Sequence, residues 1–186
     1  FGKVSVMIVR YSHDHQIDTL IMGSHGASGV RELFIGSNAE KIVRHSTVPV
    51  LVVKDTFKGP IKNIVFPNTL ETELQEDLVM KVKELQHFFG AHLHILWVNT
   101  PLNFTTDTET NKRLEQFVKR FQFKNYTINT YNHLSAEEGI VDFTKSMDAS
   151  LIAMGTHGRK GIAHMFYGSL TESLVNHTDK LVWSYV

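Results

Sequence analysis

The sequence predicts an α/β fold, in which helices cover both faces of a parallel sheet. Apolar segments of strand length alternate with segments of helical periodicity along most of the chain, and this alternation is typical of parallel sheets. A glycine-rich motif follows a buried segment at two places with the same internal spacing. The 186 residues are 42% hydrophobic and include no cysteine, so the chain is long enough to bury a core without disulfide bonds.

An internal repeat indicates the domain organisation. Met22–Gly26 matches Met154–Gly158 at an offset of 132 residues, and the match continues without gaps toward the end of each copy. Self-similarity of this kind indicates a duplicated domain. The chain then consists of the carboxyl-terminal half of a first copy at 1–53, a linker at 54–60 and a complete second copy at 61–186. Residues 61–132 have no counterpart in the first copy, so we expect a similar segment to be absent before Phe1.

The elements of the second copy follow in order from its residue pattern. Ile61–Pro67 is a short apolar segment that ends in proline, which predicts a strand. Asn68 and Glu71 are spaced as a capping box, and the helix that they predict ends at Gly90. The other expected elements are strands at 92–98, 126–131, 151–154 and 180–186, and helices at 114–121, from the Ser135–Glu138 capping box to Met147, and from Ser169. In the first copy, the last two strands recur at 19–22 and 48–53.

The repeated motif has the spacing Gly-x2-Gly-x9-Gly-Ser, and each copy follows a strand and precedes a helix. Its members are Gly23, Gly26, Gly36 and Ser37 in the first copy, and Gly155, Gly158, Gly168 and Ser169 in the second. Ligands of parallel sheets bind beyond the carboxyl ends of the strands, and the N–H groups of a helix that begins at Ser37 or Ser169 attract anions. The motif therefore predicts a phosphate site. An alternative stays open, because Ser37 with Glu40 and Ser169 with Glu172 are also spaced as capping boxes that need no ligand.

Several other functions are disfavoured by what the sequence lacks. Lys and Arg number 19 and so do Asp and Glu, so there is no net positive charge for binding duplex nucleic acid. No apolar run has the length of a membrane span. The 11 histidines show no recognisable metal-ligand spacing, and neither a P-loop, a dinucleotide fingerprint nor a nucleophile elbow is present.

The two glycine motifs resemble those of the universal stress protein family, in its ATP-binding branch. The similarity covers 61–186 and, in the first copy, Ile17–Val53. This resemblance implies a three-layer fold with a five-stranded parallel sheet, flavodoxin-like and of the adenine-nucleotide alpha-hydrolase-like type. It also implies that domains pair along their last strands, here Val48–Val53 and Lys180–Val186, in a tandem pair or a homodimer. Pairing would cover the exposed backbone groups of these strands.

By position, the resemblance implies an adenine-nucleotide site in the second copy. The implied phosphate contacts are Gly155, Thr156, His157, Gly158, Gly168, Ser169, Leu170 and Thr171, and the adenosine contacts are Pro67, Thr69, Val98 and Met154. Thr69 stands where the family usually has an aspartate, so a charge-assisted bond to the nucleoside is missing. The first copy offers only a half-site, made of Gly23, Ser24, His25, Gly26, Gly36 and Ser37. The implied ligand is ATP with Mg²⁺, or else ADP or AMP.

The leading hypothesis is a cytoplasmic regulatory module of the stress response that binds a nucleotide without turning it over. No catalytic constellation accompanies the glycine motif. A ligand-free structural or dimerisation module of the same fold is the alternative, since Thr69 lacks the usual carboxylate. Slow ATP hydrolysis is a third hypothesis.

Overall fold

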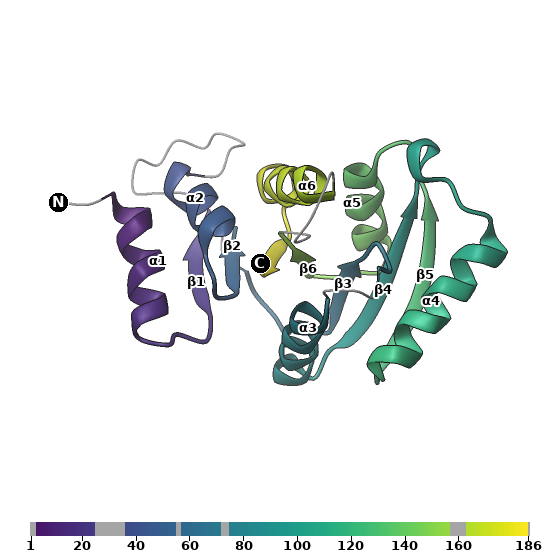
Figure 1. Cartoon of the computed structure of the whole chain (residues 1–186), viewed down its shortest axis with the longest axis horizontal. Coiled ribbons are helices and arrows are strands. Elements are labelled where there is room, and N and C mark those ends of the chain that lie inside the picture. The colour runs from purple at the N-terminus through teal and green to yellow at the C-terminus, as the bar shows by residue number, and fades with distance from the viewer. Residues whose placement is uncertain (1–2, 25–35, 55–56, 72–74, 157–162, 186) are drawn as a thin grey trace. The chain divides into compact units, whose positions relative to one another are not determined.

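The computed structural model describes residues 3–24, 36–54, 57–71, 75–156 and 163–185, of which 163–169 are described as backbone only. These residues form six α-helices, one 3-10 helix and seven strands (Figure 1). The chain divides into two compact units, Phe1–Gly59 with Met154–Val186 and Pro60–Ala153. We call them the first unit and the second unit. All strand pairings except one are parallel, and the predicted α/β class is confirmed.

The second unit is built on parallel strands that are buried on both faces. β3 (Asn63–Pro67) pairs with β4 (His92–Asn99), and β4 pairs with β5 (Tyr126–Asn132). On its other side β3 pairs, through Ile64 and Val65, with the start of β6 (Leu151–Gly155). The fully buried residues of these strands include Ile64, Val65, Phe66, Leu93, Ile95, Leu96, Leu151, Ile152 and Ala153. Burial on both faces explains why the sequence shows continuous apolar runs in β3 and β6 rather than alternation.

Three helices of the second unit begin and end with recognisable local signals. α4 (Asp107–Phe121) begins after Thr106, whose side chain accepts a hydrogen bond from the Glu109 N–H. α5 (Ala136–Ser146) begins after Ser135, which accepts from the Glu138 N–H as its capping-box spacing predicts. α3 (Glu76–Phe89) ends at Gly90, which adopts the left-handed conformation with φ 61°. A short 3-10 helix, η1 (Pro101–Asn103), joins β4 to α4.

The predicted start of α3 is wrong, because Asn68 makes a turn instead of a helix cap. Its Oδ1 accepts from the Leu70 N–H at 2.7 Å, and its Nδ2 donates to Gln75 Oε1 at 2.7 Å. Leu70 itself has φ 62° and is buried. An asparagine that bonds to the backbone two residues ahead stabilises a turn in competition with a helix. The helix therefore begins only at Glu76.

The first unit contains the elements of the first copy and the last two elements of the second. These are α1 (Val4–Asp14), β1 (Leu20–Gly23), α2 (Ser37–His45), β2 (Val50–Val53), α6 (Ala163–His177) and β7 (Leu181–Tyr185). β1 pairs with β2 in parallel, and β2 pairs with β7 in antiparallel orientation, with Leu51 opposite Trp183. The two strands that the resemblance names as pairing edges thus pair with each other. Because β2 is paired on both sides, its edge is not available to a second chain.

The core of the first unit combines residues from both copies. Its buried members are Ala39, Ile42, Val43, Val50, Val52, Val175 and Val182. Arg44 of α2 also forms an ion pair with Glu172 of α6, with Nε 2.6 Å from Oε1. Apolar burial and this ion pair together explain why residues 154–186 group with the first copy rather than with the rest of the second.

Candidate functional site

The glycine motif begins in the same way in both copies. The Ser24 N–H donates to the Val53 carbonyl at 3.0 Å, and at the equivalent position the Thr156 N–H donates to the Tyr185 carbonyl at 2.8 Å. Ser24 and Thr156 are both buried. Each bond ties the exit of the motif strand to the last strand of its copy. Ser24 and Thr156 are therefore fixed at the carboxyl ends of β1 and β6.

In the first copy, the two ends of the motif are brought together. The Gly36 N–H donates to the Ser24 carbonyl at 2.7 Å, so the last glycine of the motif returns to the end of β1. α2 begins at the next residue, Ser37, as predicted. The predicted half-site residues Gly23, Ser24, Gly36 and Ser37 thus lie around one strand end and one helix start. His25 and Gly26 lie outside the described residues, and their roles stay predictions.

Ser37 is not the cap of α2, which makes the capping-box interpretation wrong for this copy. The N-cap position is taken by Gly36, and Ser37 is the first helical residue and is exposed. The Glu40 N–H bonds to the Gly36 carbonyl at 3.1 Å, whereas the N–H groups of Ser37, Asn38 and Ala39 precede the first intrahelical bond. A glycine cap leaves these donors to water or to an anion, because it has no side chain with which to satisfy them.

The second copy differs from its prediction at the same point. α6 begins at Ala163 rather than at Ser169, so Gly168, Ser169, Leu170 and Thr171 lie inside the helix. The capping box expected from Ser169 and Glu172 is therefore wrong as well. Ala163 and the residues after it include no proline, and alanine and methionine favour helices, so the helix extends through Gly168 at a cost of about 1 kcal/mol.

Because α6 begins before Ser169, the second motif does not offer the same free N–H groups as the first. Inside a helix, each N–H group donates to the carbonyl four residues earlier, so those of Ser169 to Thr171 are occupied. Thr171 is buried, and its hydroxyl donates to the Gly155 carbonyl at 3.4 Å, which ties α6 to the end of β6. Met154 is fully buried and Gly155 is partly exposed. His157 and Gly158 fall outside the described ranges, so their predicted phosphate contacts are not tested.

The predicted adenosine contacts Pro67, Thr69 and Val98 all lie near the carboxyl ends of strands in the second unit. Pro67 is buried at the end of β3, opposite Leu96 of β4. Val98 lies one residue before the end of β4, and its side chain packs against Gly139 of α5. The glycine motif belongs to the first unit, so the single site that the resemblance implies stays a prediction.

A polar cluster around Thr69 was not predicted. The Thr69 hydroxyl accepts from Gln75 Nε2 at 3.4 Å, and its carbonyl accepts from Arg113 Nη2 at 3.2 Å. The Arg113 guanidinium also lies over the Trp97 ring, 4.9 Å from its centroid. No sequence signal pointed to Arg113, which lies 44 residues from Thr69 in α4. The Arg113 guanidinium thus lies beside Thr69, the position at which the resemblance implies an aspartate.

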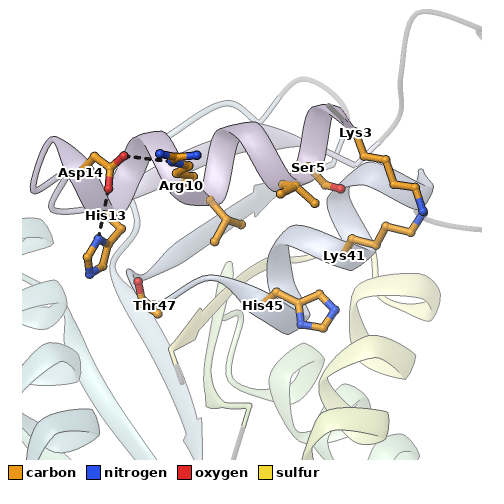
Figure 2. Close-up of a pocket in the computed structure, with 10 residues that line it drawn as sticks. Lys3, Ser5, Arg10, His13, Asp14, Lys41, His45 and Thr47 are labelled. Atoms are coloured by element: carbon orange, nitrogen blue, oxygen red, sulfur yellow. Dashed lines mark hydrogen bonds and ion pairs between the residues drawn. The ribbon is translucent and has the colours of Figure 1, made fainter. Parts of the chain in front are cut away.

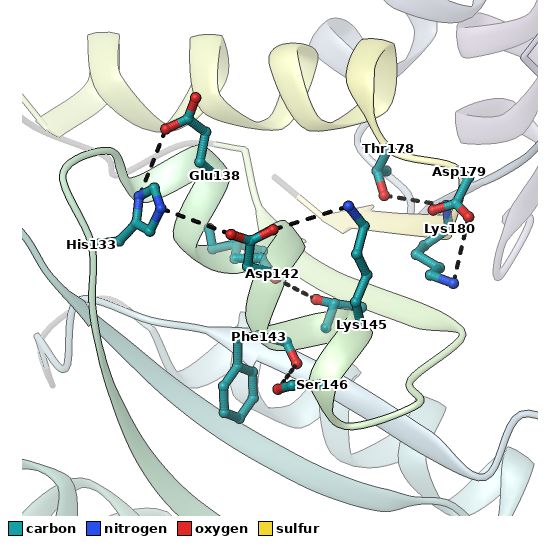
Figure 3. Close-up of polar contacts among 11 residues, drawn as sticks. His133, Glu138, Asp142, Phe143, Lys145, Ser146, Thr178, Asp179 and Lys180 are labelled. Carbon is teal, nitrogen blue, oxygen red and sulfur yellow. Dashed lines mark hydrogen bonds and ion pairs between the residues drawn. The ribbon is translucent and has the colours of Figure 1, made fainter.

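His133 lies between two carboxylates just after β5 (Figure 3). Its Nδ1 is 3.7 Å from Glu138 Oε2, and its Nε2 is 3.8 Å from Asp142 Oδ2. These distances are longer than hydrogen bonds. Nδ1 instead lies 3.1 Å from both the backbone N–H and the carbonyl oxygen of Ser135. The hydroxyl of Ser135 accepts from the Glu138 N–H, so the cluster orders the start of α5.

The described ranges contain neither a metal-binding cluster nor a helix that could span a membrane. No group of three or more His, Asp or Glu residues there is arranged to hold a metal ion. None of the described helices has the length and apolar character needed to cross a membrane.

Comparison with known proteins agrees with the family resemblance of the two glycine motifs. A model of the universal stress protein family matches residues 1–54 and 60–184. Universal stress protein Slr1230 of Synechocystis is 43% identical over 53 residues, which span 28% of this chain and 18% of that protein. Universal stress protein MJ0577 of Methanocaldococcus jannaschii is 45% identical over 47 residues, 25% of this chain and 29% of that protein. The matched stretches thus span less than a third of these curated relatives.

Solved structures share the fold at low sequence identity. A universal stress protein of Archaeoglobus fulgidus aligns with TM-score 0.70 and 20% identity, over 97% of this chain and 64% of its own. A putative universal stress protein of Pseudomonas aeruginosa aligns with TM-score 0.74 and 15% identity, over 100% of this chain and 69% of its own. A universal stress protein in complex with cAMP aligns with TM-score 0.54, 13% identity and 69% of this chain against 99% of that one. Because the family model matches almost the whole length of the sequence, the chain belongs to the universal stress protein family.

Proposed function

We propose that this protein is a regulatory module that binds an adenine nucleotide, ATP with Mg²⁺, at its glycine motif. The observation that carries the proposal is the closed motif of the first copy, which we take as the geometry that the equivalent motif of the second copy adopts when it holds a nucleotide. There the Gly36 N–H to Ser24 carbonyl bond places the start of α2 directly beside the end of β1. A strand end that faces the unpaired N–H groups of a helix is the arrangement that attracts phosphate.

Family relatives support adenine as the base. Among the structures that share the fold, one is a universal stress protein in complex with cAMP and another, from Archaeoglobus fulgidus, is in complex with dAMP. The second copy carries all the positions that would hold such a nucleotide, from Pro67 to Thr171. We therefore assign the complete site to residues 61–186 and only a half-site to residues 1–53.

Binding in the second copy requires a rearrangement of α6. The N–H groups of Ser169 to Thr171 reach a phosphate only if the helix begins at Ser169, as α2 begins at the equivalent Ser37. Nucleotide binding is then coupled to unwinding of residues 163–168. Arg113, which reaches the Thr69 carbonyl, adds a hydrogen-bond donor near the position of the missing carboxylate, which would be an acceptor.

The test is a calorimetric titration of the chain with Mg-ATP, using two matched variants. Gly158→Asp places a carboxylate in the second motif, and Gly26→Asp makes the same change in the first. We expect about one site per chain in the parent and in Gly26→Asp, and none in Gly158→Asp. No heat and no change in melting temperature at millimolar Mg-ATP would overturn the proposal.

A ligand-free structural module is the second candidate, and one observation favours it. Ser24, Thr156 and Gly36 already have hydrogen bonds within the chain, so the motif ends are satisfied without a nucleotide. This candidate predicts that Gly158→Asp leaves both the melting temperature and the titration unchanged. Slow ATP hydrolysis would instead show as phosphate release that disappears in Gly158→Asp.

A further inference from the structure

The first unit contains a groove that the nucleotide proposal does not use. It lies between α1 and α2 and has a volume of about 570 Å³, the size of a small-ligand site. Ten described residues line it: Lys3, Ser5, Val6, Val9, Arg10, His13, Asp14, Lys41, His45 and Thr47 (Figure 2). Val6 and Val9 give it apolar walls, and none of the ten is a Phe, Tyr or Trp that would stack on a base.

The groove is positively charged at one end. Lys3 and Lys41 come from the two facing segments, and their ammonium groups point toward one another (Figure 2). Neither lysine has an ion-pair partner in the described part of the chain. Asp14, the one acidic residue among the described lining residues, lies at the other end and pairs with Arg10 at 3.4 Å. Two ammonium groups that converge without a counterion repel each other, and an anion between them relieves that repulsion.

The internal repeat shows that the fold does not require these charges. At an offset of 132 residues, Ser135 stands at the position of Lys3 and Ser173 at the position of Lys41. Asp142 replaces Arg10, and Glu138 replaces Val6. Val141 stands at the position of Val9, so the second copy keeps one of the two valines. The lysine pair and Val6 are specific to the first copy, and the corresponding helices form without them.

We infer that this groove binds a single-chain anionic amphiphile, with its head group between Lys3 and Lys41 and its alkyl chain along Val6 and Val9. A compact ammonium pair suits a carboxylate or phosphate head as a point-charge site. The apolar walls give an alkyl chain the burial that an inorganic anion cannot use.

The test uses the full chain and dodecyl phosphate, titrated below its micelle concentration. We expect saturable binding at one site per chain, and binding at least about tenfold weaker for inorganic phosphate and for a neutral dodecyl glycoside. Lys3→Ser with Lys41→Ser, the residues of the second copy, should weaken dodecyl phosphate binding about tenfold or more. Val6→Glu should do the same through the apolar wall.

The controls separate this site from folding and from the nucleotide site. Lys119→Ser changes an exposed lysine of α4 in the second unit and should leave dodecyl phosphate binding unchanged. The double lysine variant should keep the parent melting temperature and the parent response to Mg-ATP. Equal binding by the double variant, or equal binding of inorganic phosphate, would overturn the inference. So would an acidic peptide that binds between the lysines when dodecyl phosphate does not.

Discussion

The same stretch of sequence is buried in one copy of the repeat and exposed in the other. Tyr11 of α1 and Phe143 of α5 hold equivalent positions, yet Tyr11 is 59% exposed and Phe143 is 5% exposed. Ile21 of β1 is 69% exposed, while its counterpart Ala153 in β6 is fully buried. The neighbours cause the difference. β6 has β3 beside it and α5 packs on β4 and β5, whereas β1 pairs only with β2 among the described strands.

The periodicity of a sequence determines which face of a helix or strand is apolar. It does not determine whether other elements pack on that face. α1 and α5 carry the aromatic residues Tyr11 and Phe143 at the compared position, and both segments fold as helices. The free energy that burial contributes depends on the strands that a helix packs against. Equivalent substitutions in the two copies therefore measure the contribution of those strands.

The largest expected difference is between Phe143→Ala and Tyr11→Ala. Phe143 contacts the rings of His94 and Tyr131, at centroid distances of 6.3 and 5.9 Å. Its removal leaves a cavity and should lower the unfolding free energy by about 3–5 kcal/mol. Tyr11→Ala should cost less than about 1 kcal/mol, because the ring is mostly exposed. Urea denaturation followed by far-UV circular dichroism measures both, and equal losses would contradict the comparison.

The next effect is expected at Gly139, whose counterpart is Met7. A Cβ on Gly139 would lie 2.7 Å from Val98 Cγ1 and 2.9 Å from His133 Cβ. Neither atom moves easily, since valine is stiff at χ1 and the His133 Cβ is next to its backbone. Gly139→Ala should therefore destabilise by about 1–3 kcal/mol, even though alanine favours helices. Met7→Ala, on the exposed face of α1, should change stability by about 0.5 kcal/mol at most. A Gly139→Ala protein that melts higher than the parent would refute the close packing.

The starts of two helices mark the limit of what the sequence could predict. The order of strands and helices, the strand at β4 and the start of α5 all followed from periodicity and capping, which act within a few residues. The starts of α3 and α6 did not follow. At Asn68 a side-chain turn competed with the cap, and at Ser169 the preceding residues favoured a helix. Such competitions depend on small free-energy differences.

The candidate site was predictable in its motif but not in its surroundings. The sequence predicted that the first motif follows a strand and precedes a helix, and β1 and α2 lie there. Arg113, in contrast, reaches Thr69 from a different helix, and the Lys3–Lys41 pair forms only because α1 packs on α2. Contacts between distant segments leave no periodic signal in the sequence. They become visible only when the elements are placed.

The unfolding free energy should depend on pH through the buried His94 of β4. Burial lowers the pKa of His94 below its ordinary value, and the neighbouring His92 lowers it further. The ring faces Thr127 Oγ1 at 2.9 Å and Asn63 Oδ1 at 3.4 Å, and neither group carries charge. As the pH falls, the unfolded chain therefore binds a proton on His94 at a higher pH than the folded protein does. Stability is therefore fully present above the ordinary histidine pKa of about 6.5 and decreases as the pH falls below it.

The variants His94→Gln and His13→Gln test this effect. Unfolding free energies from pH 8 to pH 5 should decrease less steeply in His94→Gln than in the parent. His13 is exposed on α1, so His13→Gln is the control for replacing a histidine that lies outside the core. Identical slopes for His94→Gln and the parent would show that burial of this ring does not contribute to the acid sensitivity.

The smallest effect is expected at the ion pair that joins the two copies within the first unit. Arg44 and Glu172 are held by a short contact, but the Arg44 side chain is 49% exposed, so solvent screens the attraction. Arg44→Ala should therefore lower the unfolding free energy by only about 0.2–1 kcal/mol. The difference from the parent should disappear in 1 M salt, where the Debye length is about 3 Å. A loss that persists in high salt would mean that Arg44 acts by packing its alkyl chain on α6. The charge would then contribute little, and the apolar core around Val43 and Val175 would hold α2 against α6 by itself.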